Sequence, residues 1–133
     1  MTASSLRVLV LGSAAGGGLP QWNCGCENCA AARDDSSSIR PQSQSSLAVS
    51  ADGLNWSILN ASPDLRSQLA ANAALYPEGL RGSPVRNVVL TNGDIDHVAG
   101  LLVLRERHAF TIYATAHIAA LLRENSVFGV LDP

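Results

Sequence analysis

An alternation of short apolar runs with segments of helical periodicity is the feature that most constrains the fold. Residues 6–12 (LRVLVLG), 85–91 (VRNVVLT) and 110–115 (FTIYAT) have the length and composition of buried strands. The runs SSLAVS and NWSILN flank an Ala-Asp-Gly turn, which predicts a β-hairpin. The resulting order β, ββ, α, β, α, β, α is typical of an α/β fold with helices packed against a mixed sheet.

Helices are expected in three places. Residues 62–74, 98–108 and 116–125 have helical periodicity. Ser62 is a good N-cap, Pro63 suits the first helical position, and Asp64 favours the positive end of the helix dipole. A role for Asp64 beside a metal is the alternative. Residues 34–46, rich in Ser, Gln and Pro, predict a mobile surface loop.

The predicted sheet is not balanced by enough helices to cover both of its faces. The 133-residue chain ends directly after a helical segment, and a bare sheet face would expose an apolar patch that soluble monomers avoid. We therefore expect residues 1–133 to form an α/β domain that is unfinished and needs a further layer on the bare face of its sheet.

Composition excludes several classes of function. The chain is 47% hydrophobic with 9 basic and 11 acidic residues, and all the basic residues are scattered arginines. No stripe of positive charge offers a nucleic-acid surface, and no apolar run approaches the roughly 20 residues of a membrane helix. We expect a folded cytoplasmic protein, in which clustered cysteines indicate thiol or metal chemistry and seldom a disulfide.

Three cysteines lie close together in the segment CGCENC. Cys24, Cys26 and Cys29 could fill three corners of a tetrahedral zinc site, since thiolates are preferred zinc ligands. A redox pair of Cys26 with Cys29 has the two-residue spacing of dithiol motifs and is one alternative. Three free cysteines are another. A structural Zn²⁺ is the interpretation that we favour.

The glycine-rich segment GSAAGGG follows the first predicted strand. A phosphate-binding loop of the P-loop type would need lysine where Gly18 stands, and the dinucleotide pattern would need glycine where Gln21 stands. Neither pattern is met. The segment therefore predicts a loop whose backbone passes close to another group.

The segment TNGDIDH joins the fourth predicted strand to a helix. Ligands in α/β folds usually bind at the carboxyl ends of strands, and Asp94, Asp96 and His97 supply three candidate metal ligands there. The alternative is a polar turn, in which Asp96 caps the helix and Asp94 is exposed.

Three stretches together resemble the family of pyrroloquinoline quinone (PQQ) biosynthesis protein B. They are VLGSAAGGGLPQWNCGCENC, QSSLAVSADGLNWSILNASPDLRSQL and VVLTNGDIDHVAGLLVLRE. The resemblance runs from Leu6 to the last residue and covers only the N-terminal half of the family. It implies half of a metallo-β-lactamase-type αββα sandwich, with a mixed sheet and helices on one side.

The resemblance also implies a site and an activity. The superfamily motif His-x-His-x-Asp-His falls on Asn92, Asp94, Asp96 and His97, so that two histidines are replaced. Carboxylates with one imidazole favour Fe²⁺ or manganese over a two-zinc hydrolytic centre. The implied function is an iron-dependent oxygenase, or hydroxylase, acting on the tyrosine of a peptide-derived Glu-Tyr precursor of PQQ. A carrier that moves PQQ or its precursor to the periplasm, and a metallohydrolase of the superfamily, are the alternatives.

Overall fold

The computed structural model describes residues 5–131, and its backbone is built on five strands in one sheet. The strands are β1 (Arg7–Gly12), β2 (Ser46–Ser50), β3 (Trp56–Leu59), β4 (Val85–Val89) and β5 (Thr111–Tyr113). The α-helices are α1 (Glu27–Ala31), α2 (Leu65–Ala70), α3 (Ile95–Val98) and α4 (Ala116–Glu124). Short 3₁₀ helices cover Ala73–Leu75, Ala99–Leu104 and Ser126–Leu131. All five predicted strands are present.

The sheet is mixed, as predicted. Its strand order is β1-β2-β3-β4-β5, with the β1–β2 and β2–β3 pairs antiparallel and the β3–β4 and β4–β5 pairs parallel. The predicted β2–β3 hairpin is confirmed. Its connection is held by Asp52, whose carboxylate accepts hydrogen bonds from the backbone N–H groups of Leu54 and Asn55. These bonds, led by those from Asn55, hold the pKa of Asp52 well below its usual range.

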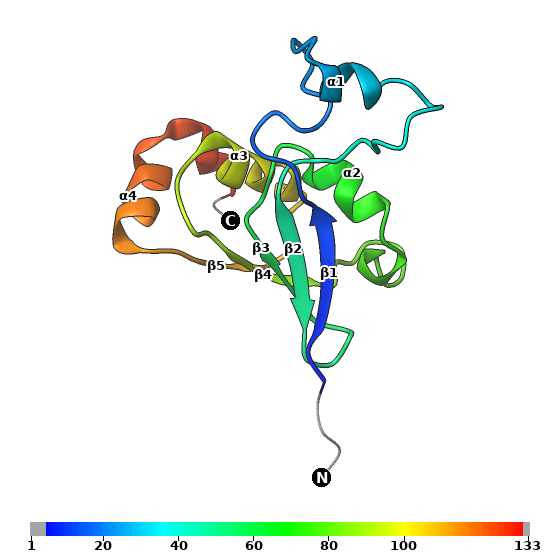
Figure 1. Ribbon diagram of the computed structural model, residues 1–133. Helices are drawn as coiled ribbons and strands as arrows, with labels where there is room; N and C mark the ends of the chain where they lie inside the picture. Colours follow the sequence, from blue (N-terminus) through cyan, green and yellow to red (C-terminus); the bar gives the residue numbers. More distant parts are fainter. Residues whose placement is uncertain (1–4, 132–133) are drawn as a thin grey trace.

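One face of the sheet carries the core. Cross-strand neighbours Ala48, Ile58 and Val88 have no exposed surface, and they form one row across β2, β3 and β4. The row is covered by buried residues of the helical segments, among them Leu65 of α2 and Leu101. The helices therefore pack against this face, as Figure 1 shows for α2 and α3.

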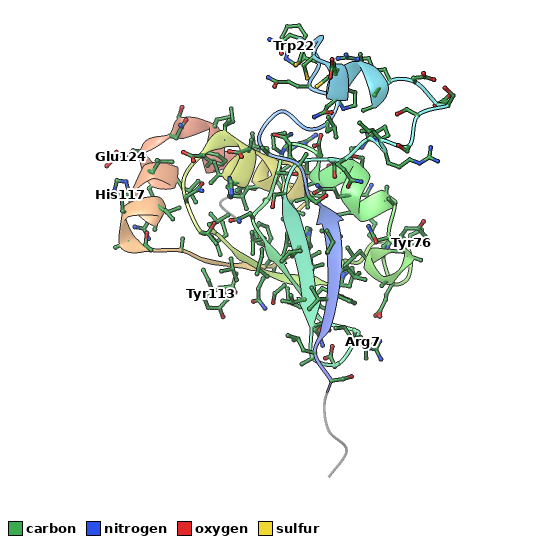
Figure 2. The ribbon with its side chains drawn as sticks, viewed as in Figure 1. Arg7, Trp22, Tyr76, Tyr113, His117 and Glu124 are labelled. Carbon is green, nitrogen blue, oxygen red and sulfur yellow. The ribbon has the colours of Figure 1, made fainter. Side chains whose placement is uncertain are left out.

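The other face of the sheet is also apolar, but nothing in residues 5–131 covers it. A second row runs through Val10, Leu47, Leu59, Val89 and Tyr113, which pair across neighbouring strands. Val10 at one end is 65% exposed and Tyr113 at the other is 57% exposed. Tyr113 projects from β5 away from α3 and α4 (Figure 2). A face of this kind is suited to packing against a second layer.

Two predicted helices are shorter than their sequence pattern. The segment expected over 62–74 is an α-helix only over α2, because Asn72 adopts an extended backbone before the next 3₁₀ turn. The segment expected over 98–108 consists of the end of α3 followed by the 3₁₀ helix Ala99–Leu104. By contrast α4 matches its prediction closely, and Thr115 caps it by accepting a hydrogen bond from the Ile118 N–H.

The cysteine segment projects from the sheet. After β1 the chain leaves the body of the molecule, forms α1, and returns to β2 (Figure 1). The end of the predicted loop 34–46 is not loose: backbone hydrogen bonds tie Gln42 to Leu19, and Ser43 and Ser45 to Ala14. In the described part of the chain, no helix is both long enough and apolar enough to cross a bilayer.

Candidate metal centres

The three cysteines converge. The Sγ atoms of Cys24, Cys26 and Cys29 all lie within 4.8 Å of one another, and all three thiols are free of disulfides. Cys26 stands at the N-cap of α1, and Cys29 lies inside this helix and is buried. No helix was expected over this segment, so α1 was missed. Three sulfur atoms at this spacing can occupy three corners of a tetrahedral site.

Hydrogen bonds shift the acidity of two of these thiols in opposite directions. The pKa of Cys26 is lowered, first by the backbone N–H of Cys29 and then by the thiols of Cys24 and Cys29. At Cys29 the largest single influence, a hydrogen bond from the Gln21 backbone, lowers the pKa, but burial and the two neighbouring thiols together raise it. Three thiolates cannot all be charged this close together without a cation between them.

Arg33 braces the cysteine segment from outside. Its Nη1 donates to the carbonyl oxygens of Cys24 at 2.8 Å and Cys29 at 3.3 Å, and its Nη2 donates to the carbonyl of Gln21 at 2.7 Å. One planar guanidinium thus holds both ends of the segment. Sequence reasoning missed Arg33, because an exposed arginine four residues after a cysteine carries no signal of its own.

The second centre follows β4. Side chains of Asp96 and His97 are only 24% and 19% exposed, and His97 Nδ1 lies 3.1 Å from Asp96 Oδ1. The two atoms are not aligned for a hydrogen bond, so the buried Nδ1 has no hydrogen-bond partner among the described residues. A buried polar atom without a partner needs an explanation, such as a bound ion. Two ligand atoms each about 2.1 Å from a metal are also about 3 Å apart at neighbouring corners.

Asp94 is placed differently from its two partners. It is exposed and forms the N-cap of α3, where its carbonyl accepts the N–H groups of His97 and Val98. Asn92 turns its side-chain oxygen to the N–H of Asp94. In the part of the chain that the structure describes, the cysteines are the only set of three potential ligands within 4.8 Å. The structure thus brings Asp96 and His97 together, and a metal role for Asp94 stays a prediction.

The end of β3 holds the Asp96 segment in place. Asn60, which has a positive φ of 62°, accepts hydrogen bonds from the N–H and hydroxyl of Thr91. Next to it, the Ala61 N–H donates to the carbonyl of His97, and the Gly100 N–H donates back to Ala61. The prediction that Ser62 caps the next helix is wrong, because α2 begins at Leu65 and its N-cap is Asp64, with no capping hydrogen bond from the side chain. Asn60 and Ala61 instead anchor the segment of the candidate ligands, which sequence reasoning did not foresee.

The glycine-rich loop passes directly over Asp96. A Cβ placed on Gly16 would lie 3.1 Å from Asp96 Oδ2, which is tighter than ordinary van der Waals contact. The prediction that this backbone approaches another group is confirmed, and the group is the Asp96 carboxylate. Any larger residue at this position would push the carboxylate aside.

Comparison with protein families agrees with this fold. Residues 55–133, more than half of the chain, match the beta-lactamase superfamily domain. The chain therefore belongs to the beta-lactamase superfamily. Within it, the chain resembles one particular protein, coenzyme PQQ synthesis protein B, as the sequence predicted. It is 63% identical over 130 residues to that protein from Rhizobium meliloti and 60% identical over 126 residues to that from Ruegeria pomeroyi.

These relatives are longer than the chain. It covers 43% of the Rhizobium meliloti protein and 42% of the Ruegeria pomeroyi protein, while 98% and 95% of its own length is matched. Among solved structures, the Zn²⁺-bound PqqB from Methylobacterium extorquens superposes with a TM-score of 0.92 at 56% identity, over 96% of this chain and 46% of that one. A diphosphatase of the PhnP family shares the fold, with a TM-score of 0.71 at 23% identity over 90% of this chain and 46% of that one. The predicted half of a metallo-β-lactamase-type sandwich is confirmed.

Proposed function

We propose that this chain is the N-terminal part of a single metallo-β-lactamase-like domain that works in the synthesis of coenzyme PQQ, and that it does so in the cytoplasm. The proposal is supported by the identity of 63% to coenzyme PQQ synthesis protein B across nearly the whole chain. The observation that carries it is the Asp96–His97 pair at the end of β4, with a buried imidazole nitrogen that has no hydrogen-bond partner among the described residues. The substrate that we propose is a small peptide-derived precursor of PQQ.

The cysteine segment is proposed to hold a structural Zn²⁺. Its residues fit this ion, since Cys24, Cys26 and Cys29 are free, converge within 4.8 Å and include one thiol of lowered pKa. The similar PqqB structure is described as Zn²⁺-bound. Such an ion would lock the projecting segment and stabilise it, because structural zinc contributes folding free energy directly.

Asp96 and His97, with Asp94 as a further candidate, are proposed to hold a catalytic Fe²⁺. Carboxylate oxygens and one imidazole fit Fe²⁺ or Mn²⁺ better than the histidine-rich set of a two-zinc hydrolase. When bound, Fe²⁺ would supply the redox chemistry of an oxygenase that hydroxylates the tyrosine of the Glu-Tyr precursor. In this chain Asp96 would contribute a carboxylate oxygen and His97 an imidazole nitrogen, and the glycine loop lies against the carboxylate.

The test uses a full-length protein that carries this segment. After anaerobic loading with Fe²⁺, it should consume oxygen when the peptide-derived Glu-Tyr substrate is added. Asp96→Ala should abolish consumption while substrate binding, measured by calorimetry, persists. Binding of the substrate with no oxygen uptake by the iron-loaded wild type would contradict the oxygenase and favour a carrier.

The zinc proposal is tested separately. Metal analysis of the purified protein should show about one zinc per chain in excess of any metal at Asp96. Changing Cys24, Cys26 and Cys29 to serine should remove that zinc. Its retention in the triple variant would overturn the assignment.

A further inference from the structure

A buried glutamine connects three segments that surround the candidate iron site. Gln44 is only 9% exposed, and its side-chain Nε2 and its backbone N–H both donate to Asp64 Oδ2, at 3.1 and 2.9 Å. Its side-chain Oε1 accepts the N–H of Gly17 at 3.0 Å. With the nitrogen held by Asp64, the amide oxygen has one orientation, which faces the glycine loop.

Other buried polar groups fix the backbone of Gln44 in place through hydrogen bonds. Gln68 of α2, which is 3% exposed, donates its amide to the Gln44 carbonyl at 2.7 Å and to the Ser43 hydroxyl at 2.9 Å. Its Oε1 accepts the hydroxyl of Ser62, which has no exposed surface. The network passes so close to β1 that a Cβ on Gly12 would collide with it. A buried network with its groups satisfied is rigid and specifies one arrangement.

The loop that Gln44 holds is the loop that covers Asp96. The Gly17 N–H donates to Gln44 Oε1, and the preceding Gly16 lies against the Asp96 carboxylate. The carboxylate in turn lies 3.1 Å from His97 Nδ1. A chain of contacts therefore runs from Asp64 through Gln44 and the glycine loop to the candidate ligands, and neither Asp64 nor Gln44 is itself placed among them.

We propose that Gln44, anchored by Asp64, is a positioning residue for the metal site: it fixes the glycine loop over Asp96 and thereby confines the carboxylate beside His97. This inference rests on the proposed metal site and identifies the residue that holds its ligands in place before a metal binds. Groups that orient metal ligands from outside typically change metal affinity 10- to 100-fold when they are removed.

The probe is Mn²⁺, a hard cation that carboxylate and imidazole bind and thiolates bind poorly. The full-length protein is first loaded with zinc to fill the cysteine segment, and Mn²⁺ binding is then followed by the electron paramagnetic resonance signal of the free ion. Gln44→Leu should raise the Kd for Mn²⁺ about tenfold. Zinc content at the cysteines should not change.

Gln42→Leu is the matched control, because Gln42 Oε1 accepts a hydrogen bond from Ser13 of the same loop, whereas its side chain is exposed and, among the described residues, makes no hydrogen bond to Asp64. It should leave the Kd for Mn²⁺ unchanged. An equal loss in Gln42→Leu and Gln44→Leu, or no loss in Gln44→Leu, would overturn the inference.

Gly16→Ala gives a second, independent reading if Gln44→Leu does not fold. The added methyl group should displace the Asp96 carboxylate and weaken Mn²⁺ binding by a similar factor; unchanged binding would overturn the inference. Asp96→Asn separates this outcome from failure of the site itself. If wild type and Asp96→Asn bind Mn²⁺ equally, the proposed metal site is wrong, whereas a loss in Asp96→Asn with no loss in Gln44→Leu or Gly16→Ala overturns only the role of Gln44.

Discussion

Single side chains at the two candidate centres show what kind of residue each needs. The backbone carbonyl of His97 accepts a hydrogen bond from the Ala61 N–H, just after β3, so the position of the Asp96–His97 pair depends on the fold. The thiols of Cys24, Cys26 and Cys29 depend instead on local contacts within one projecting segment. The ligand residues could be predicted from the sequence because their types and spacing are chemically specific. Their supporting residues, Arg33 and Gln44, could not, because arginine and glutamine have no preferred partner until the chain is folded.

Arg33→Ala should loosen the proposed zinc site. It removes three hydrogen bonds from one guanidinium to the carbonyls of Gln21, Cys24 and Cys29, and the loss of such outer contacts typically weakens metal binding by about tenfold or more. Transfer of zinc to a chromophoric chelator measures the effect. Arg33→Lys should recover only part of the affinity, since it restores the charge and not the planar fork. Arg66→Ala, at an exposed position on α2, is the control, and equal zinc loss there would contradict the role of Arg33.

His108 should make stability sensitive to acid. Burial, followed by the charge of Arg86, lowers its pKa in the folded chain. The unfolded chain therefore takes up a proton at higher pH than the folded chain does. Stability is fully present above the unfolded pKa near 6.5 and declines as pH falls through the lower folded pKa. His108→Gln should flatten the dependence of the urea midpoint on pH between about 7 and 5. His117→Gln, at an exposed site on α4, should not flatten it; the same slope in wild type and His108→Gln would contradict the account.

At the scale of elements, the sequence predicted the type of each strand and helix better than its boundaries. Strands were well predicted because Leu9, Ile58 and Val88 belong to apolar runs that alternate with the register of the sheet. The segment after α3 was not, because helical periodicity is shared by α- and 3₁₀-helices over a few residues. The close contact of Gly100 with Ser62, which is visible only in three dimensions, constrains where this segment lies.

Gly100→Ala should disturb both stability and the Asp96 site. A Cβ there would collide with the Ser62 carbonyl oxygen, so the start of the 3₁₀ helix must move away from the end of β3. Overpacking of this kind typically costs 1–3 kcal/mol, which gives about 2 kcal/mol from urea unfolding. Because the Gly100 N–H also bonds Ala61, Mn²⁺ binding should weaken as well. Gly129→Ala, where the added group meets open space, should change neither the free energy of unfolding nor Mn²⁺ binding. A Gly100→Ala variant that matches wild type in both would contradict the role of this contact.

At the scale of the whole molecule, both faces of the sheet are apolar, so each face needs a layer that covers it. Its second apolar row ends in exposed Val10 and Tyr113, and the chain spans less than half of the relatives that it matches. We propose that the second sheet of the sandwich packs on this row. The uncovered face could be predicted from the order of strands and helices alone, because each layer of an α/β fold must bury its apolar side.

The isolated 133-residue chain should self-associate through this face. Val10→Thr combined with Tyr113→Thr should shift the chain toward monomer in sedimentation velocity, since both side chains lie exposed on the face. Leu80→Ser removes a leucine that is fully exposed elsewhere and serves as the control. A monomeric wild type, or an equal shift toward monomer in Leu80→Ser, would contradict a role for this face in self-association.

The central claim is that Asp96 and His97 hold a metal ion jointly. Anomalous diffraction at the iron edge, from crystals of a full-length protein carrying this segment and loaded anaerobically with Fe²⁺, tests it most directly. The account predicts an anomalous peak about 2.1 Å from both the Asp96 carboxylate and the His97 imidazole, beneath the glycine loop. A fully loaded crystal with iron only elsewhere, and with these two side chains bonded to other protein groups, would contradict it.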